Sequence, residues 1–222
     1  YKAYSTHLKE LYGEKVYKLP VNLPVTCPNR MDGDGCTFCG GVGTGFEAMN
    51  SEVSVSEQLN ATKGKITKRY KAKKFIAYFQ AYTNTYAPVE YLRKIFTEAI
   101  RHPSVVAVSI GTRPDCLGED VLELLSELNQ IKPVWIELGL QTIHERTAAY
   151  IRRGYPLSVF ETAVRNLRER GIEVIGHTIL GLPGESQEDI LATMKYLNYR
   201  DIQGIKLQLL HVLKGTDLAQ EY

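Results

Sequence analysis

The chain has 222 residues, of which 44% are hydrophobic and 23% are charged, and its formal net charge is +2. This composition is that of an ordinary globular protein and excludes a disordered chain or a polycation, and the sequence shows no transmembrane run or signal peptide. Four cysteines, three of them in one loop, do not resemble a secreted disulfide framework, so we expect a cytoplasmic protein with no membrane partner. The chain begins at Tyr1 and stops just after a strand-like run, so we expect residues to be missing at both ends.

Short apolar runs rich in β-branched residues alternate with amphipathic stretches along the chain. Residues 1–20 are expected to form a lead-in segment that packs on a core domain of residues 21–222. Six runs are apolar on both faces, as strands covered by helices should be, and are predicted as strands at Val21–Thr26, Lys74–Gln80, Val105–Ile110, Val134–Leu138, Glu173–Leu180 and Gly204–Leu210. Four stretches carry one apolar stripe and are predicted as helices at Pro88–Arg101, Asp120–Asn129, Pro156–Arg170 and Ser186–Tyr199.

The alternation of strand and helix predicts an α/β fold with parallel strands and right-handed crossovers. Six strands favour an open, partial (β/α)6 barrel over a closed barrel of eight. In such barrels the active site is built at the C-terminal ends of the strands. Polar or glycine-rich segments follow every predicted strand, which indicates a functional site at that end.

The first of these segments, TCPNRMDGDGCTFCGG, holds Cys27, Cys36 and Cys39 in the spacing Cys-x8-Cys-x2-Cys. Its glycines allow a tight loop that points the thiolates inward, where they can bind a soft metal centre. A structural zinc site normally has four ligands, and no histidine lies near this loop. Three cysteines on an iron–sulfur cube would instead leave one iron open. Zinc, and three thiols that bind nothing, remain as alternatives.

Three motifs resemble the radical S-adenosylmethionine (SAM) superfamily: the cysteine loop, the segment Glu137-Leu-Gly-Leu-Gln-Thr and the turn Leu180-Gly-Leu-Pro-Gly-Glu. The wide cysteine spacing, Thr112-Arg-Pro-Asp and Arg153-Gly154 are similar to the Elongator catalytic subunit and its bacterial relatives. The segments KAYSTHLKELYGEKVYKLPV, QAYTNTYAP and LLHVLKGTDL resemble the YtqA/YhcC group in particular. The resemblance covers essentially the whole chain and implies the TIM-like partial barrel of the radical SAM type.

The resemblance also implies cofactors and partners. Cys27, Cys36 and Cys39 would hold a [4Fe–4S] cluster whose open iron is chelated by SAM. An electron, from a donor such as a flavodoxin or ferredoxin, would cleave SAM and leave a 5′-deoxyadenosyl radical that abstracts a hydrogen atom from the substrate. Cys116, a lone thiol outside the loop, is a candidate catalytic hydrogen-atom donor or, alternatively, a small buried hydrophobe.

The residues implied to bind SAM come from the ends of several strands. Gln80, Tyr82 and Asn84 stand where the family has a GGE-like stretch that holds the SAM amino group, so the individual contacts depart from the family pattern there. Arg153 matches an arginine that can pair the SAM carboxylate. The implied set is Gln80, Tyr82, Asn84, Thr112, Arg113, Glu137, Gln141, Arg153, His177, Gly181 and Leu182, with Glu137 and Gln141 facing the ribose and methionine and the last two along the adenine.

A basic run without any acidic residue suggests the substrate: Lys63, Lys65, Lys68, Arg69, Lys71, Lys73 and Lys74. At the edge of an active-site face it would fit a phosphate backbone; the alternative is a solvated helix face. The resemblance implies tRNA, with trimming of 5-carboxymethylaminomethyl-uridine towards 5-aminomethyl-uridine at the wobble position, where the base would splay into the barrel mouth. Open alternatives are a radical SAM enzyme on a small-molecule or porphyrin-like substrate, a non-catalytic iron–sulfur or SAM-binding module, and a zinc-stabilised RNA-binding domain.

Overall fold

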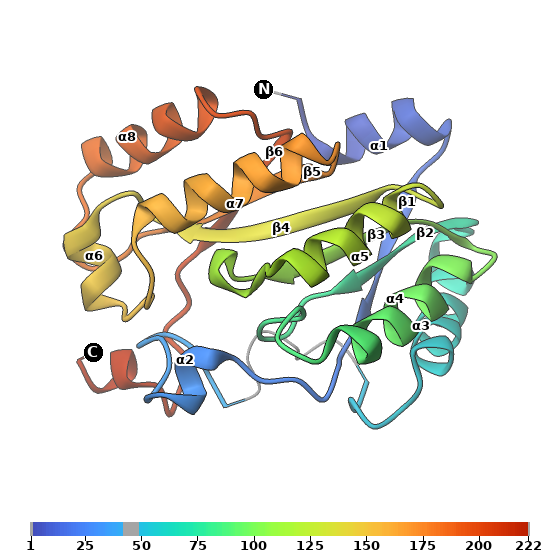
Figure 1. The fold of residues 1–222 in the computed structure, drawn as a ribbon, viewed down its shortest axis with the longest axis horizontal. Helices are drawn as coiled ribbons and strands as arrows, with labels where there is room; N and C mark the ends of the chain where they lie inside the picture. The colour runs from blue at the N-terminus through green and yellow to red at the C-terminus, as the bar shows by residue number, and fades with distance from the viewer. Residues whose placement is uncertain (1, 42–48, 222) are drawn as a thin grey trace.

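The computed structural model describes residues 2–41 and 49–221. Six parallel strands form one sheet in sequence order: Val16–Val21 (β1), Lys74–Phe79 (β2), Val105–Thr112 (β3), Val134–Gln141 (β4), Glu173–Leu180 (β5) and Gly204–Leu209 (β6). The sheet curls with its helices on the outside, as Figure 1 shows. The predicted α/β partial barrel of six parallel strands is therefore confirmed.

The prediction of the first strand at Val21–Thr26 is wrong, because β1 lies at Val16–Val21 and pairs with β2 along its whole length. Pro20 lacks a backbone donor and interrupts the apolar pattern, which hides this strand in the sequence. Proline is tolerated on an edge strand, and β1 is one edge of the sheet. Residues 16–20 of the expected lead-in segment therefore belong to the sheet.

The helices are Tyr4–Tyr12 (α1), Pro28–Met31 (α2), Val55–Tyr70 (α3), Val89–Arg101 (α4), Glu119–Asn129 (α5), Glu145–Tyr150 (α6), Leu157–Glu169 (α7) and Gln187–Asn198 (α8), with 3₁₀ turns at Pro114–Cys116 and Asp217–Gln220. The four predicted helices correspond to α4, α5, α7 and α8. The sequence analysis missed α3, although a capping box of Ser54 and Glu57 marks its start. No helix in the described ranges is long and apolar enough to cross a membrane.

The main core lies between the sheet and the helices outside it. Phe79 of β2 meets Phe96 of α4 edge to face, with ring centroids 5.1 Å apart, and both side chains are fully buried. A second apolar cluster lies inside the barrel, where Leu8 of α1 packs against Ile76 and Trp135. Helix α1 therefore closes the N-terminal end of the barrel and leaves the opposite end for the site.

Strand β6 differs from the prediction that every strand is apolar on both faces. Its residues alternate, with Ile205, Leu207 and Leu209 exposed. Lys206 points into the barrel, because its ammonium contacts Glu137 of β4 and Tyr78 of β2. The inner surface of the barrel therefore carries charge that the sequence pattern did not indicate.

Candidate active site

A cavity of about 540 Å³ opens at the C-terminal ends of the strands. Its wall is built from the cysteine loop after β1 and from residues of β2 to β6. Cys27, Cys36 and Cys39 all line it. The structure thus brings the three loop thiols to the place where a parallel barrel presents its active site.

Side chains within and behind the cysteine loop hold its shape. Arg30 donates from Nη2 to the carbonyls of Cys39 and Gly40, at 2.8 and 2.6 Å. Asn29 donates from Nδ2 to the carbonyl of Arg152, at 2.6 Å, which ties the loop to the segment after α6. These hydrogen bonds to backbone carbonyls fix the shape of the loop.

The C-terminal segment and an apolar cluster support the same loop. The backbone N–H of Leu218 donates to the carbonyl of Thr37 at 3.0 Å, and in Figure 1 the C-terminal turn lies beside α2. Phe38, between two of the cysteines, packs on a cluster that contains Ile179 and Leu182. The loop is therefore anchored on the sheet through Phe38 and on the C-terminal segment through Thr37.

The cysteine loop offers three thiolate donors to the cavity. A structural zinc site normally has four ligands, whereas three thiolates can each hold one iron of a four-iron cube and leave the fourth iron open. In the residues described, no group of three histidine, cysteine or acidic side chains could hold one metal ion. The number and type of the donors therefore fit a cluster better than a structural zinc ion. Burial, together with the neighbouring Cys39, raises the pKa of the Cys36 thiol to about 11, so this thiol needs a cation beside it to lose its proton.

Most of the residues predicted to bind SAM lie on the cavity wall. These are Gln80, Tyr82, Thr112, Arg113, Glu137, Gln141, Arg153 and His177. Asn84, Gly181 and Leu182 are not part of the wall. Asn84 is buried and donates from Nδ2 to the carbonyl of Gly111 at 2.9 Å, and Leu182 packs under Phe38. Asn84 and Leu182 therefore support neighbouring parts of the site, and their positions do not support the prediction that they face SAM.

Among the buried polar atoms on this wall, Oε1 of Gln141 and Nε2 of His177 have no hydrogen-bond partner in the described residues. Burial, with Lys206 nearby, lowers the pKa of His177 to about 4, so its ring is neutral at pH 7. A buried polar atom left unpaired costs about 1–3 kcal/mol, so both atoms call for a polar ligand. SAM, with its amino, carboxylate, hydroxyl and adenine groups, fits such a wall.

Arg153 has a different place from the one predicted. Its side chain is only 2% exposed, and it donates to the carbonyls of Tyr155, Leu140 and Thr142 and to Glu145. The guanidinium is thus used by the protein itself. The ring of Tyr155 lies between Arg153 and Arg113, with guanidinium-to-ring distances of 5.0 and 4.8 Å. Four of its five N–H donors are used within the protein. Arg153 therefore fixes the turn after β4, and it has no free pair of donors for the expected bidentate pairing with a SAM carboxylate.

Glu137 is also occupied within the protein. Lys18 contacts one carboxylate oxygen, which also accepts from Ser109, while Lys206 and Tyr78 donate to the other at 3.0 and 2.9 Å. Burial alone would raise the pKa of Glu137, but Lys18 and Lys206 outweigh it and hold the pKa at about 2. The sequence analysis missed Lys18, Tyr78 and Lys206, and only the period-two alternation along the strands could have indicated them.

Cys116 lies outside the cavity wall, at the 3₁₀ turn after β3. Burial, and then the adjacent Asp115, raise the pKa of its thiol to about 12. Because Cys116 is not part of the wall, its thiol has no direct contact with a substrate in the cavity. Its predicted role as a hydrogen-atom donor stays a prediction without support from its position.

The basic run does not lie at the edge of the active-site face, and that prediction of its place is wrong. Lys63, Lys65, Lys68 and Arg69 lie on α3, whose C-terminal end leads to the N-terminal end of β2. Lys74 is the first residue of β2, 3.5 Å from Glu14. Lys71 and Lys73 are exposed at that same end of the barrel. The run thus extends along α3 away from the cavity mouth.

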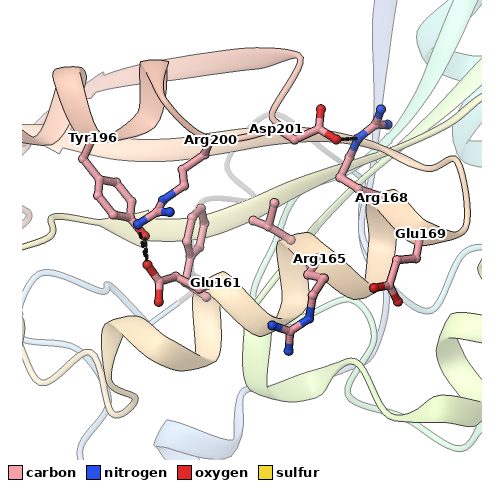
Figure 2. A pocket seen from close by; sticks show the side chains of 9 residues that line it. Glu161, Arg165, Arg168, Glu169, Tyr196, Arg200 and Asp201 are labelled. Carbon is pink, nitrogen blue, oxygen red and sulfur yellow. Dashed lines mark hydrogen bonds and ion pairs between the residues drawn. The ribbon is translucent and has the colours of Figure 1, made fainter.

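A second hollow, of about 550 Å³, lies on the outside of the sheet between α7 and α8. Figure 2 shows two ion pairs across it: Arg200 contacts Glu161 at 2.6 Å, and Arg168 contacts Asp201 at 3.1 Å. Its charges are largely paired internally, and no cysteine lines it. The chemistry of the chain therefore belongs to the cysteine cavity.

Residues 21–197 match the Radical SAM superfamily. The chain belongs to the radical SAM superfamily. Enzymes of this superfamily use a [4Fe–4S] cluster and SAM, which are therefore the cofactors of this chain. It is 44% identical over 226 residues to the protein YtqA of Bacillus subtilis, covering 100% of this chain and 70% of that protein. It is 41% identical over 220 residues to the protein YhcC of Escherichia coli K12, covering 97% and 70%.

More distant superfamily members share part of the sequence or only the fold. A tRNA uridine(34) acetyltransferase of Dehalococcoides mccartyi is 31% identical over 131 residues, 57% of this chain and 28% of that protein. The archaeal Elp3 of Methanocaldococcus infernus superposes with a TM-score of 0.69 at 20% identity, over 92% of this chain and 48% of that one. The methyltransferase TsrM of Kitasatospora setae, with cobalamin and a [4Fe–4S] cluster bound, superposes with a TM-score of 0.60 at 15% identity, over 97% and 38%. These structural likenesses show the fold alone.

Proposed function

We propose that the chain is a radical SAM enzyme that modifies the 5-substituent of the wobble uridine in tRNA. The proposed reaction converts 5-carboxymethylaminomethyl-uridine to 5-aminomethyl-uridine. Loss of a hydrogen atom and then of one electron from the methylene beside the carboxylate would give an imine, whose hydrolysis breaks the C–N bond and releases the two carbons as glyoxylate. SAM would be the two-electron oxidant and would leave as 5′-deoxyadenosine and methionine. The observation that carries the proposal is the sequence similarity to tRNA uridine(34) acetyltransferases, 31% over 131 residues, which goes beyond a shared fold.

The cavity offers suitable groups for each cofactor. Cys27, Cys36 and Cys39 would hold the [4Fe–4S] cluster, and Thr112 and Gln141 on the same wall would contact SAM. When bound, these cofactors supply, after one electron from a flavodoxin or ferredoxin, a radical able to remove a hydrogen atom from an unactivated carbon. The protein's part is to position the substrate carbon and to exclude water, for which the closed N-terminal end of the barrel is suited.

A wobble base can reach such a cavity only when it leaves the anticodon stack. The cysteine loop is followed by α3, and the basic residues of α3 run from mid-helix to the far end of the barrel. An anticodon stem lying along α3 would place its loop near the cavity and its phosphates near these lysines. The position of the basic run is therefore compatible with tRNA binding, although the run lies outside the cavity.

The experiment is an anaerobic reaction of the reconstituted chain with SAM, dithionite and tRNA carrying 5-carboxymethylaminomethyl-uridine. Digestion and mass spectrometry of the wobble nucleoside should show 5-aminomethyl-uridine. The Cys36→Ala variant serves as the matched control and should give unchanged nucleoside. Formation of 5′-deoxyadenosine together with unchanged wobble nucleoside in the wild-type reaction would refute the assignment to tRNA.

A further inference from the structure

A polar layer crosses the inside of the barrel below the cavity mouth. Four side chains from different strands meet there through hydrogen bonds: Lys18 of β1, Tyr78 of β2, Glu137 of β4 and Lys206 of β6. The layer is charged, although the apolar cluster around Leu8 and Trp135 lies directly beneath it. Buried charge is costly unless an opposite charge lies beside it, so an excess of one sign in this layer points to a charged ligand.

The charges of this layer do not cancel. Lys18 and Lys206 are two ammonium groups, and Glu137 is the single carboxylate between them. His177, which stands opposite Lys206 in the register of β5 and β6, adds no charge because its pKa is lowered by burial. One positive charge therefore remains uncompensated within the layer.

The uncompensated charge is accessible through Lys206 rather than Lys18. The Lys18 ammonium lies over the rings of Tyr78 and Tyr4, at 3.9 and 5.3 Å, and Lys18 is not part of the cavity wall. The two side chains are similarly exposed, 33% for Lys206 and 28% for Lys18, but Lys206 lines the cavity and Lys18 does not. Its Nζ donates to Glu137 and Tyr78, at 3.0 and 2.6 Å, so one of its three N–H donors is unused.

A second donor stands beside it. His177 lines the cavity, and its buried Nε2 has no partner among the described residues. A neutral imidazole with its proton on Nε2 can donate one hydrogen bond. An ammonium N–H and an imidazole N–H on neighbouring strands, around an excess positive charge, match the two oxygens of a carboxylate.

We propose that Lys206 and His177 form a carboxylate-binding subsite inside the cavity that recognises the carboxymethyl group of the substrate's wobble uridine. The proposal rests on the proposed function and names the group that selects the substrate. SAM also carries a carboxylate. The loop that would hold the cluster, and SAM with it, follows the C-terminal end of β1, whereas Lys206 is the third residue of β6, deeper in the barrel. The substrate is therefore the assigned source of the carboxylate.

The test compares two anticodon stem-loops that differ only at the wobble substituent. One carries 5-carboxymethylaminomethyl-uridine and the other its neutral amide, 5-carbamoylmethylaminomethyl-uridine. Binding is measured on the reconstituted full chain with SAM and without reductant, so that no turnover occurs. Wild type should bind the carboxylate form about tenfold more tightly or better, the worth of a charge-assisted hydrogen bond.

Three variants locate the origin of this preference. Lys206→Gln should bind the two stem-loops equally, whereas Lys206→Arg keeps the charge and should keep most of the preference. Lys195→Gln, an exposed lysine of α8, should behave as wild type. If Lys206→Gln does not fold, the wild-type preference and the Lys206→Arg variant still decide the proposal.

Several results would overturn the subsite. One is equal binding of both stem-loops by wild type. Another is a preference for the carboxylate stem-loop that is unchanged in Lys206→Gln. If that variant also loses affinity for SAM, the carboxylate bound at Lys206 is that of SAM. Turnover of the carboxylate stem-loop, measured separately with dithionite, tests the proposed function. Turnover without a preference removes the subsite alone, while a preference without turnover keeps the subsite and removes the proposed reaction.

Discussion

Asn29 donates a hydrogen bond from its Nδ2 to the Sγ atom of Cys36 over 3.4 Å. The same amide also donates to the carbonyl of Arg152, so one side chain connects a proposed cluster ligand with the segment that follows α6. Gly154 closes this arrangement from the other side. A Cβ on Gly154 would lie 2.8 Å from Oδ1 of Asn29, which is closer than real contacts allow.

We predict that Gly154→Ala lowers the iron content of the reconstituted protein to less than half of the wild-type value, because Asn29 must move and take Cys36 with it. The measurement is iron per chain after anaerobic reconstitution. Gly171→Ala is the matched control, since Gly171 has a similarly positive φ (+68° against +84°) but nothing within 4 Å of a Cβ. Equal iron content in the two variants would show that the Asn29 contact does not matter.

Single cysteine replacements should separate the loop thiols from the fourth one. Cys27→Ala, Cys36→Ala and Cys39→Ala should each abolish iron binding, since each thiolate would hold one iron of the cube. Cys116→Ala should keep the full iron content and its absorbance near 400 nm, because Cys116 lies outside the cavity wall. Full iron retention in Cys36→Ala would refute the proposed ligand set.

Arg153→Ala should destabilise the fold by about 3 kcal/mol, because it leaves three carbonyls and Glu145 without their buried donor. Arg153→Lys should not restore the loss, since lysine lacks the planar fork of donors. Urea unfolding measures the effect, and Arg165→Ala on the exposed face of α7 is the control, with a change within about 0.5 kcal/mol. A normally stable Arg153→Ala protein that fails to bind SAM would instead restore the carboxylate-pairing role.

The Glu137 carboxylate should make stability depend on acid pH. Its pKa in the folded protein is held at about 2, below its usual 4.5, so it stabilises the fold above pH 4.5 and loses this contribution as the pH falls towards 2. Between pH 6 and 3, wild type should therefore lose roughly 2 kcal/mol more unfolding free energy than Glu137→Gln. Parallel losses in the two proteins, measured by urea unfolding at both pH values, would mean that Lys18 and Lys206 do not hold the carboxylate ionised.

The basic run is tested by the salt dependence of tRNA binding. If an anticodon stem lies along α3, reversing the charges of Lys68, Arg69 and Lys71 should flatten the slope of log affinity against log salt by about two to three. Reversing Lys195, Lys214 and Arg165, three exposed basic residues elsewhere, is the matched control. Equal slopes for the two triple variants would return the run to a solvated helix face.

Much of the fold could be predicted because buried parallel strands are continuous apolar runs and their crossover helices carry a clear stripe. Strand β1 could not, since its sequence combines Pro20, tolerated on an edge, with Lys18, which is stabilised by a carboxylate far along the chain. Lys206 of β6 likewise points into the barrel because its ammonium is paired with Glu137 of β4. Local pattern cannot reveal charges that are balanced only across the barrel.

The site shows the same division. The three loop cysteines and most of the wall could be predicted, because the C-terminal ends of parallel strands meet in one place. The hydrogen bonds of Arg153 and Glu137 within the protein could not be predicted, since their partners are backbone carbonyls and side chains from other strands. A motif thus indicates where a residue lies more reliably than whether its polar atoms are free.

The proposed function requires a radical formed in the cysteine cavity to abstract a hydrogen atom from the wobble substituent of tRNA. A tRNA deuterated at the methylene groups of its 5-carboxymethylaminomethyl substituent, incubated anaerobically with the reconstituted chain, SAM and dithionite, tests it directly. Mass spectrometry of the 5′-deoxyadenosine formed should show deuterium transferred from the substituent. Undeuterated 5′-deoxyadenosine beside an intact wobble nucleoside would refute the proposed reaction.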